Sequence, residues 1–174
     1  VAQLAQHIEA DLVVIGPEQP LVDGLADRLR ALGVRVFGPG ADGAQVEGSK
    51  AYMKELALAA GIPTARFAAF DEVDGALAFL RSLPGPYVVK TDGLAAGKGV
   101  LVTDDLAEAE ADVRAKLAGQ SFGDAGRRVV IEECLTGPEG SVFAVCDGTR
   151  TVCLAPAQDF KRVGDGGAGP NTGG

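Results

Sequence analysis

The stretch that decides the fold is PYVVKTDGLAAGKGVLVT, residues 86–103. Its two apolar runs, 87–90 and 100–103, are rich in β-branched residues, and the loop between them, 92–99, is rich in glycine. Short β-branched runs bounded by Gly and Asp are typical of strands. The stretch therefore predicts two antiparallel strands joined by a glycine-rich loop of residues 92–99, which we call the flap.

The flap contains a candidate anion site. Gly97 and Gly99 let backbone N–H groups approach an anion closely, and Lys98 between them adds positive charge. A P-loop has a longer spacing between its glycines and a hydroxyl residue after the lysine, whereas here Gly99 follows Lys98. Lys90 ends the first strand, so Lys90 and Lys98 could face one phosphate chain across the hairpin. The alternative is a plain glycine-rich hairpin with solvated lysines.

The amino-terminal part has the pattern of a parallel sheet. Residues 11–16 (DLVVIG) and 34–38 form short apolar runs, and leucines recur at helical spacing over residues 21–32 between them. Strand, helix and strand in this order predict a βαβ unit. The turn at residues 16–18 follows the first strand, where open α/β sheets bind ligands, although an ordinary βα turn is an equally good interpretation.

Helices and strands alternate in the rest of the chain. Apolar spacing predicts helices over residues 49–60, 71–80 and 106–117, with Asp71 as the cap of the second helix. Strand patterns cover residues 128–134 and a hairpin, 141–155, whose turn is Asp147-Gly148. Glycine is too frequent from Gly164 onward for regular structure, so a loop is predicted there.

The composition argues against several functions. The formal net charge of −8 is unfavourable for binding a nucleic-acid backbone. No apolar run approaches the ~20 residues of a membrane span, and no secretory leader is visible. One histidine, His7, and cysteines without CxxC spacing make a zinc site hard to build. Cys134, Cys146 and Cys153 are therefore predicted to be small buried apolar residues of a reduced, cytoplasmic protein.

Several blocks of the sequence resemble a known family. Three blocks look like the nucleotide site of the ATP-grasp fold, in which two α+β subdomains clamp ATP. These blocks are PYVVKTDGLAAGKGV, GSKAYMKELALAAGIPTA and VVIEECLTGPEGS. Seven blocks are similar to the phosphoribosylamine–glycine ligase family in particular. They are VIGPEQPLVDG, FGP, EGSK, KTDGLAAGKGV, FGDAG, QDFKRVGDG and GPNTGG. The blocks come in the family's order and cover nearly the whole chain.

The resemblance implies a mixed fold class, α/β and α+β. Residues 1–48 would be the end of an open α/β domain that precedes the ATP-grasp fold. Residues 49–174 would be part of the ATP-grasp domain, with a glycine-rich lid subdomain at about 68–136. The chain would then be a fragment that lacks both ends of the family's pattern.

The same resemblance implies an ATP site. Lys50 and Lys90 would reach the phosphates from the two subdomains, and Gly97, Lys98 and Gly99 would cover them. Lys90 and Lys98 would be the catalytic residues.

The adenosine part of ATP would lie on an acidic segment. Glu132 and Glu133, with the backbone at Leu135, would line the adenine, and Glu139 would accept hydrogen bonds from the ribose. The alternative for Glu132 and Glu133 is an exposed strand end.

The implied substrate contacts lie at the two ends of the chain, namely Gly16, Pro17, Glu18, Asp159, Lys161, Asn171 and Thr172. The sequence departs from the family's pattern at two places near these residues. Phe160 stands where many members have histidine, and Gly167-Ala168 stands where an Asp-Thr pair is usual.

The implied reaction joins glycine to 5-phosphoribosylamine in purine biosynthesis, through an acyl phosphate, with ATP converted to ADP and phosphate. ATP and Mg²⁺ would be required. The family's metal ligands are expected outside this chain, so no metal residue is assigned. The fragment itself is therefore expected to be inactive. The partners would be small molecules, with no nucleic acid or membrane. The alternatives are another ATP-grasp carboxylate–amine ligase or carboxylase, a non-catalytic nucleotide-binding module and a plain structural domain.

Overall fold

The computed structural model describes residues 1–95, 99–119, 127–158, 160 and 162–171. The chain divides into two compact units, Val1–Cys134 and Leu135–Gly174. The first unit contains two hydrophobic clusters, and the second consists mainly of two strand pairs. Each unit is described by itself below.

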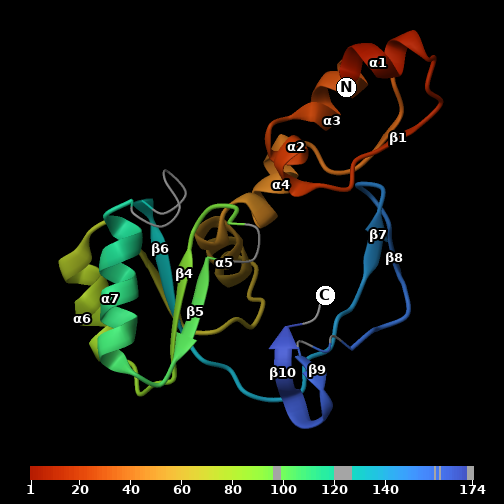
Figure 1. Ribbon diagram of the computed structural model, residues 1–174. Coiled ribbons are helices and arrows are strands. Elements are labelled where there is room, and N and C mark those ends of the chain that lie inside the picture. The colour runs from red at the N-terminus through yellow and green to blue at the C-terminus, as the bar shows by residue number, and fades with distance from the viewer. Residues whose placement is uncertain (96–98, 120–126, 159, 161, 172–174) are drawn as a thin grey trace. The chain divides into compact units, whose positions relative to one another are not determined.

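The amino-terminal elements confirm the predicted parallel pairing. Strand β1 (Val13–Val14) pairs in parallel with β2 (Val36–Phe37). Around them lie α1 (Ala2–His7), α2 (Glu18–Val22), α3 (Leu25–Ala31) and α4 (Ala41–Gly48), seen in Figure 1. Helices α1 and α4 were not predicted, because neither has a wide apolar stripe.

The single helix predicted over residues 21–32 is wrong. Gly24, with φ of 78°, interrupts it and separates α2 from α3. This left-handed conformation costs glycine little, because glycine has no Cβ. The leucines on the two sides of the break still pack together, because Leu21, Leu25 and Leu29 all lie in one buried cluster with Ile15.

The first unit also contains a four-stranded sheet, formed between residues 67 and 133. Its strands are β3 (Phe67–Phe70), β4 (Tyr87–Thr91), β5 (Val100–Thr103) and β6 (Val129–Glu133), in the order β3-β6-β4-β5. All neighbouring pairs are antiparallel, which confirms the hairpin predicted on either side of the flap. Strand β3 was not predicted, since its sequence, FAAF, is short and has no polar alternation.

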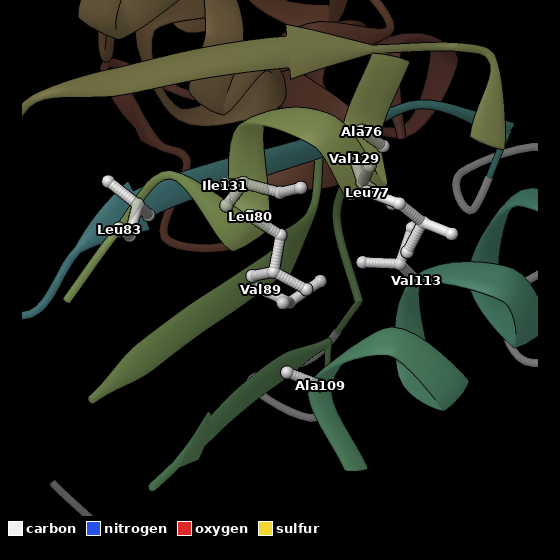
Figure 2. Close-up of a cluster of buried hydrophobic side chains, with 9 residues drawn as sticks. All are labelled: Ala76, Leu77, Leu80, Leu83, Val89, Ala109, Val113, Val129 and Ile131. Atoms are coloured by element: carbon white, nitrogen blue, oxygen red, sulfur yellow. The ribbon is translucent and has the colours of Figure 1, made fainter. Parts of the chain in front are cut away.

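Helices cover both faces of this sheet (Figure 1). Helices α6 (Val73–Arg81) and α7 (Leu106–Leu117) pack on one face, and α5 (Lys50–Ala59) lies at the other. Figure 2 shows the cluster beneath α6 and α7, where Leu80, Val89 and Ile131 are fully buried. The predicted cap at Asp71 is wrong, because the residue before α6 is Glu72 and its side chain makes no capping bond.

The second unit confirms one hairpin and corrects another prediction. Strands β7 (Ala144–Cys146) and β8 (Thr151–Cys153) are joined by the predicted turn, in which Asp147 Oδ1 accepts hydrogen bonds from the backbone N–H groups of Thr149 (2.8 Å) and Arg150 (2.7 Å). These bonds stabilise the carboxylate and hold the pKa of Asp147 below its usual range.

The loop predicted after Gly164 is wrong. Strands β9 (Arg162–Gly164) and β10 (Ala168–Asn171) pair antiparallel around a 3₁₀ turn, η2 (Asp165–Gly167). Glycine is compatible with this hairpin because Gly166 and Gly169 have φ of 69° and 85°, where other residues are strained. The glycines therefore permit the tight turn.

The cysteine prediction is only partly correct. None of the three cysteines, all of which the structure describes, is in a disulfide. Cys146 and Cys153 are exposed on β7 and β8, and Cys134 is partly buried. The prediction failed because alternation in a two-stranded hairpin does not show which face is covered. Among the described residues, no helix is both long and apolar enough to cross a membrane.

Candidate functional site

The register of the four-stranded sheet brings Lys90 and Glu132 together. In the β4–β6 pair, Val88 lies opposite Glu132 and Lys90 lies opposite Val130. Side chains alternate along a strand, and Val89 and Ile131 point into the core beneath α6 and α7. Lys90 and Glu132 therefore lie diagonally adjacent on the opposite face, the face of α5.

Helix α5 adds a second lysine to this pair. The two oxygens of the Glu132 carboxylate form ion pairs with different lysines, Oε1 with Lys90 and Oε2 with Lys54. Lys54 Nζ also donates a hydrogen bond to Thr64 Oγ1 (3.1 Å) and lies 5.4 Å from the centre of the Phe67 ring. Glu132 and Lys54 are only 3% and 5% exposed, so the pair is buried.

The electrostatics keep Glu132 ionised. Burial raises the pKa of Glu132, but hydrogen bonds from Lys54 and Lys90, together with their positive charges, outweigh burial and leave the pKa below the ordinary value of 4.5. Two ammonium groups and one carboxylate leave a net positive charge in this cluster. The Lys90 side chain, 29% exposed, is the member open to solvent.

Asp92, at the start of the flap, holds the amino end of α5. Ser49 Oγ donates to the Asp92 carboxylate, at 3.0 Å from each oxygen, and the Ala51 N–H donates to Asp92 Oδ1 at 2.7 Å. Lys50 Nζ donates to the backbone oxygen of Gly93 at 3.1 Å. These contacts fix Lys50 beside the beginning of the flap.

Lys50 and Lys90 lie close enough to influence each other. Burial lowers the pKa of Lys50, the charges of Asp92 and Glu47 raise it, and the charge of Lys90 lowers it; the net shift is downward. Lys50 bonds to the flap at Gly93, and Lys90 lies on β4, the strand that leads into the flap. A bound anion would relieve the repulsion between their two positive charges.

The described part of the flap closes on strand β4. The Thr91 N–H donates to the backbone oxygen of Gly99 at 2.8 Å. A Cβ at Gly99 would overlap Thr91 Oγ1 and would lie 2.7 Å from the Cβ of Ala95. This position therefore requires glycine for steric reasons, while Gly97 and Lys98 lie outside the described residues.

The acidic segment is arranged differently from an exposed strand end. Glu132 is buried, so that alternative is wrong for this residue. Glu133 Oε1 accepts a hydrogen bond from the Arg66 N–H at 2.9 Å, which ties the end of β6 to the residue before β3. Leu135 and Glu139 belong to the second unit and are exposed within it.

The predicted substrate residues fall in different parts of the chain. Gly16 follows β1, Pro17 precedes α2 and Glu18 begins α2, so this turn lies at the carboxyl end of a parallel strand. Asn171 ends β10 opposite Arg162. Asp159, Lys161 and Thr172 lie outside the residues that the structure describes.

Sequence reasoning assigned no role to Lys54 or Asp92. A signal for Lys54 was present, because it is spaced three residues from both Ala51 and Ala57, which form the buried face of α5. Asp92 gave no such signal, since its partners come from a distant part of the chain. Within the described ranges, no group of three or more His, Cys, Asp or Glu side chains could hold a metal ion, so we derive no step through a metal.

Comparison with known proteins identifies the class and then the family. The ATP-grasp (A) domain model of phosphoribosylglycinamide synthetase matches residues 48–174, and the N domain model matches residues 1–47. The fold is thus that of an ATP-grasp protein. The chain belongs to the phosphoribosylglycinamide synthetase family.

Individual relatives agree with this assignment. A phosphoribosylamine–glycine ligase of Xanthomonas campestris is 57% identical over 98% of this chain, which spans 40% of that relative. The crystal structure of a phosphoribosylamine–glycine ligase from Thermotoga maritima matches 97% of this chain with a TM-score of 0.82 and 34% identity, over 42% of its own length. The biotin carboxylase domain of a Hydrogenobacter thermophilus 2-oxoglutarate carboxylase, in complex with MgADP, has a TM-score of 0.75 over 93% of this chain and 37% of its own, and its 19% identity supports the fold alone.

Proposed function

We propose that this chain provides the phosphate-binding part of a phosphoribosylamine–glycine ligase. The reaction would join glycine to 5-phosphoribosylamine, giving glycinamide ribonucleotide, ADP and phosphate, in purine biosynthesis. The observation that carries the proposal is the placement of two lysines beside the flap. Lys50 Nζ donates to the backbone oxygen of Gly93 at 3.1 Å, and Lys90, with a side chain 29% exposed, lies on β4, the strand that leads into the flap. The Xanthomonas relative, which bears the ligase name, supports the substrates.

ATP would lie with its phosphates between the two lysines. Lys50 would approach from the start of α5 and Lys90 from the end of β4, with Gly97, Lys98 and Gly99 covering the phosphate chain. Phosphoryl transfer needs alignment of the reactants and stabilisation of charge more than it needs covalent chemistry from the protein. Lysines around an anionic phosphate supply this stabilisation.

In the proposed reaction, a carboxylate oxygen of glycine would attack the γ-phosphorus of ATP, and ADP would leave. The amine of 5-phosphoribosylamine would then attack the acyl carbon, lose a proton and expel phosphate. The residues of this chain would bind and orient the nucleotide and exclude water. Mg²⁺, when bound, would neutralise further phosphate charge, and we propose that its ligands lie outside this chain.

The other predicted contacts remain part of this proposal. Glu132, Glu133 and the backbone of Leu135 would border the adenine, and Glu139 would accept from the ribose. Because both oxygens of Glu132 already face lysines, its contribution would come through its backbone and through Lys90. The substrate side would include Gly16, Pro17, Glu18, Asp159, Lys161, Asn171 and Thr172, in an enzyme of the cytoplasm.

Release of ADP by the full-length protein tests this proposal. We expect release to require both glycine and 5-phosphoribosylamine. Release with another carboxylate or amine, but not with this pair, would indicate a different ATP-grasp ligase or carboxylase. Binding of ATP without any turnover would indicate a nucleotide-binding module.

A further inference from the structure

Lys54 is a buried cation to which the proposed reaction gives no role. We propose that Lys54 is a positioning residue that controls the charge and the place of the Lys90 ammonium group through Glu132. This inference rests on the proposed ATP site at Lys50 and Lys90. It adds a residue that would affect nucleotide binding without touching the nucleotide.

The contacts of Lys54 show why it would act indirectly. It lies one helical turn beyond Lys50 on α5, but its side chain is 6% exposed and points to the sheet. Its ammonium group is shared among the Glu132 carboxylate, Thr64 Oγ1 and the face of the Phe67 ring. A group enclosed by these three partners has no free direction toward a ligand, so any influence must pass through Glu132.

The first consequence concerns charge. Lys54 and Lys90 each bring one positive charge to a single carboxylate, so the cluster is left with one positive charge. If Lys54 were uncharged, Glu132 and Lys90 would neutralise each other. The phosphates of ATP would then meet a pair without net charge, in a partly buried place where screening by solvent is weak.

The second consequence concerns position. Lys54 engages Glu132 Oε2, which leaves Oε1 for Lys90. Without Lys54, both carboxylate oxygens would be free to bind the Lys90 ammonium group and draw it toward the sheet. Lys54 would therefore keep Lys90 on the solvent side of the cluster, where its side chain is 29% exposed.

A double-variant experiment separates this role from a purely structural one. In the full-length protein, we expect Lys54→Met to raise the Kd and KM for ATP by about tenfold, with the KM for glycine unchanged. The double variant Lys54→Met with Glu132→Gln again has one positive charge, on Lys90, and is expected to recover most of the ATP affinity. A structural role predicts the opposite, because two packing defects in one buried cluster would not correct each other.

Two control variants accompany the single and double variants. Lys54→Arg keeps the charge and should bind ATP within about threefold of the wild type. Lys116→Met removes another buried lysine, which is paired with Asp112 on α7, away from this face of the sheet. It is expected to lower stability without changing the Kd for ATP. Should Lys54→Met fail to fold, Lys54→Gln, alone and with Glu132→Gln, makes the same comparison.

The outcomes are distinguishable. Unchanged ATP affinity in the folded Lys54 variant, or a double variant that binds ATP no better than the single one, would overturn the inference alone. A wild-type protein that does not bind ATP would overturn the proposed function and this inference with it. Loss of ATP affinity in Lys54→Met and its recovery in the double variant would support both.

Discussion

Asp92 and Ser49 are joined across the chain: the Ser49 hydroxyl donates to the Asp92 carboxylate, with Oγ 3.0 Å from each oxygen. The same hydroxyl oxygen accepts a hydrogen bond from the Tyr52 N–H at 3.1 Å and caps α5. One connected set of hydrogen bonds thus links the first residue of the flap to the helix that carries Lys50 and Lys54. The position of these lysines depends on this link.

Replacement of Asp92 tests that dependence. We expect Asp92→Ala to lower the free energy of unfolding by about 1–2 kcal/mol, because a helix end loses its capping carboxylate. It should also raise the KM for ATP, because Lys50 is no longer fixed beside the flap. Denaturant titration and steady-state kinetics measure the two effects. In the control Ser82→Ala, a hydroxyl that donates to the Phe79 backbone oxygen at the end of α6 is lost, and the KM should stay unchanged.

Gly99 gives a steric prediction. Gly99→Ser adds a Cβ that overlaps Thr91 Oγ1, and Thr91 is fully buried and cannot easily move. We expect the variant to lose ATP affinity and to gain no magnesium-dependent hydrolysis, since the new hydroxyl does not convert the flap into a P-loop. The control is Gly75→Ala in helix α6, where alanine is favourable and the new Cβ would lie at an ordinary 3.4 Å from the Phe70 ring. This variant should keep its ATP affinity. Faster hydrolysis in Gly99→Ser would contradict our interpretation of the flap.

Elements with local signals could be predicted from the sequence. The hairpin around the flap follows from two β-branched runs and their glycines, and α7 follows from its apolar spacing. The break at Gly24 and the pairing of β9 with β10 could not be read in this way. Both depend on left-handed glycines whose role is decided by neighbouring structure.

In the candidate site, too, only residues with a local sequence signal could be proposed in advance. Lys90 was proposed from its place at the end of a strand, and Lys50 was proposed through the family resemblance of the block EGSK. The ion pairs of Glu132 were not found, because they depend on the register between β4 and β6 and on the face that α5 covers. Such contacts join residues far apart in the chain, and local patterns contain no information about them.

Glu132 gives the folded protein a pH-dependent stability. Its pKa lies below 4.5 in the folded state, because the bonds and charges of Lys54 and Lys90 outweigh the effect of burial. The folded state therefore binds this proton less readily than the unfolded state does. Its stabilising contribution is complete above the ordinary pKa and is lost as the pH falls through the folded pKa. Urea titrations from pH 6 downward should show a steeper loss of stability in the wild type than in Glu132→Gln, and equal slopes would contradict this assignment.

The chain of residues 1–174 should bind ATP weakly and show no ligase turnover. It contains the candidates for the phosphate contacts, whereas we propose that the ligands of Mg²⁺ lie outside it. A metal contributes several kcal/mol to such a transition state, and about 1.4 kcal/mol corresponds to a tenfold change in rate. Titration with ATP, with and without magnesium, and an assay of glycine-dependent phosphate release check both parts. Turnover near that of the full-length protein would show that the catalytic residues are assigned wrongly.

The most direct test of the account is the affinity of the full-length Lys90→Ala variant for ATP. Lys90 is the solvent-open member of the Lys54–Glu132–Lys90 cluster and lies on β4, the strand that leads into the flap. Calorimetric titration should show that the variant binds ATP more weakly by roughly 1.5–3 kcal/mol, the scale of a hydrogen bond to a charged group, while adenosine binds equally to both proteins. Unchanged ATP affinity in a folded Lys90→Ala variant would contradict the account, because it would remove Lys90 from the phosphate site.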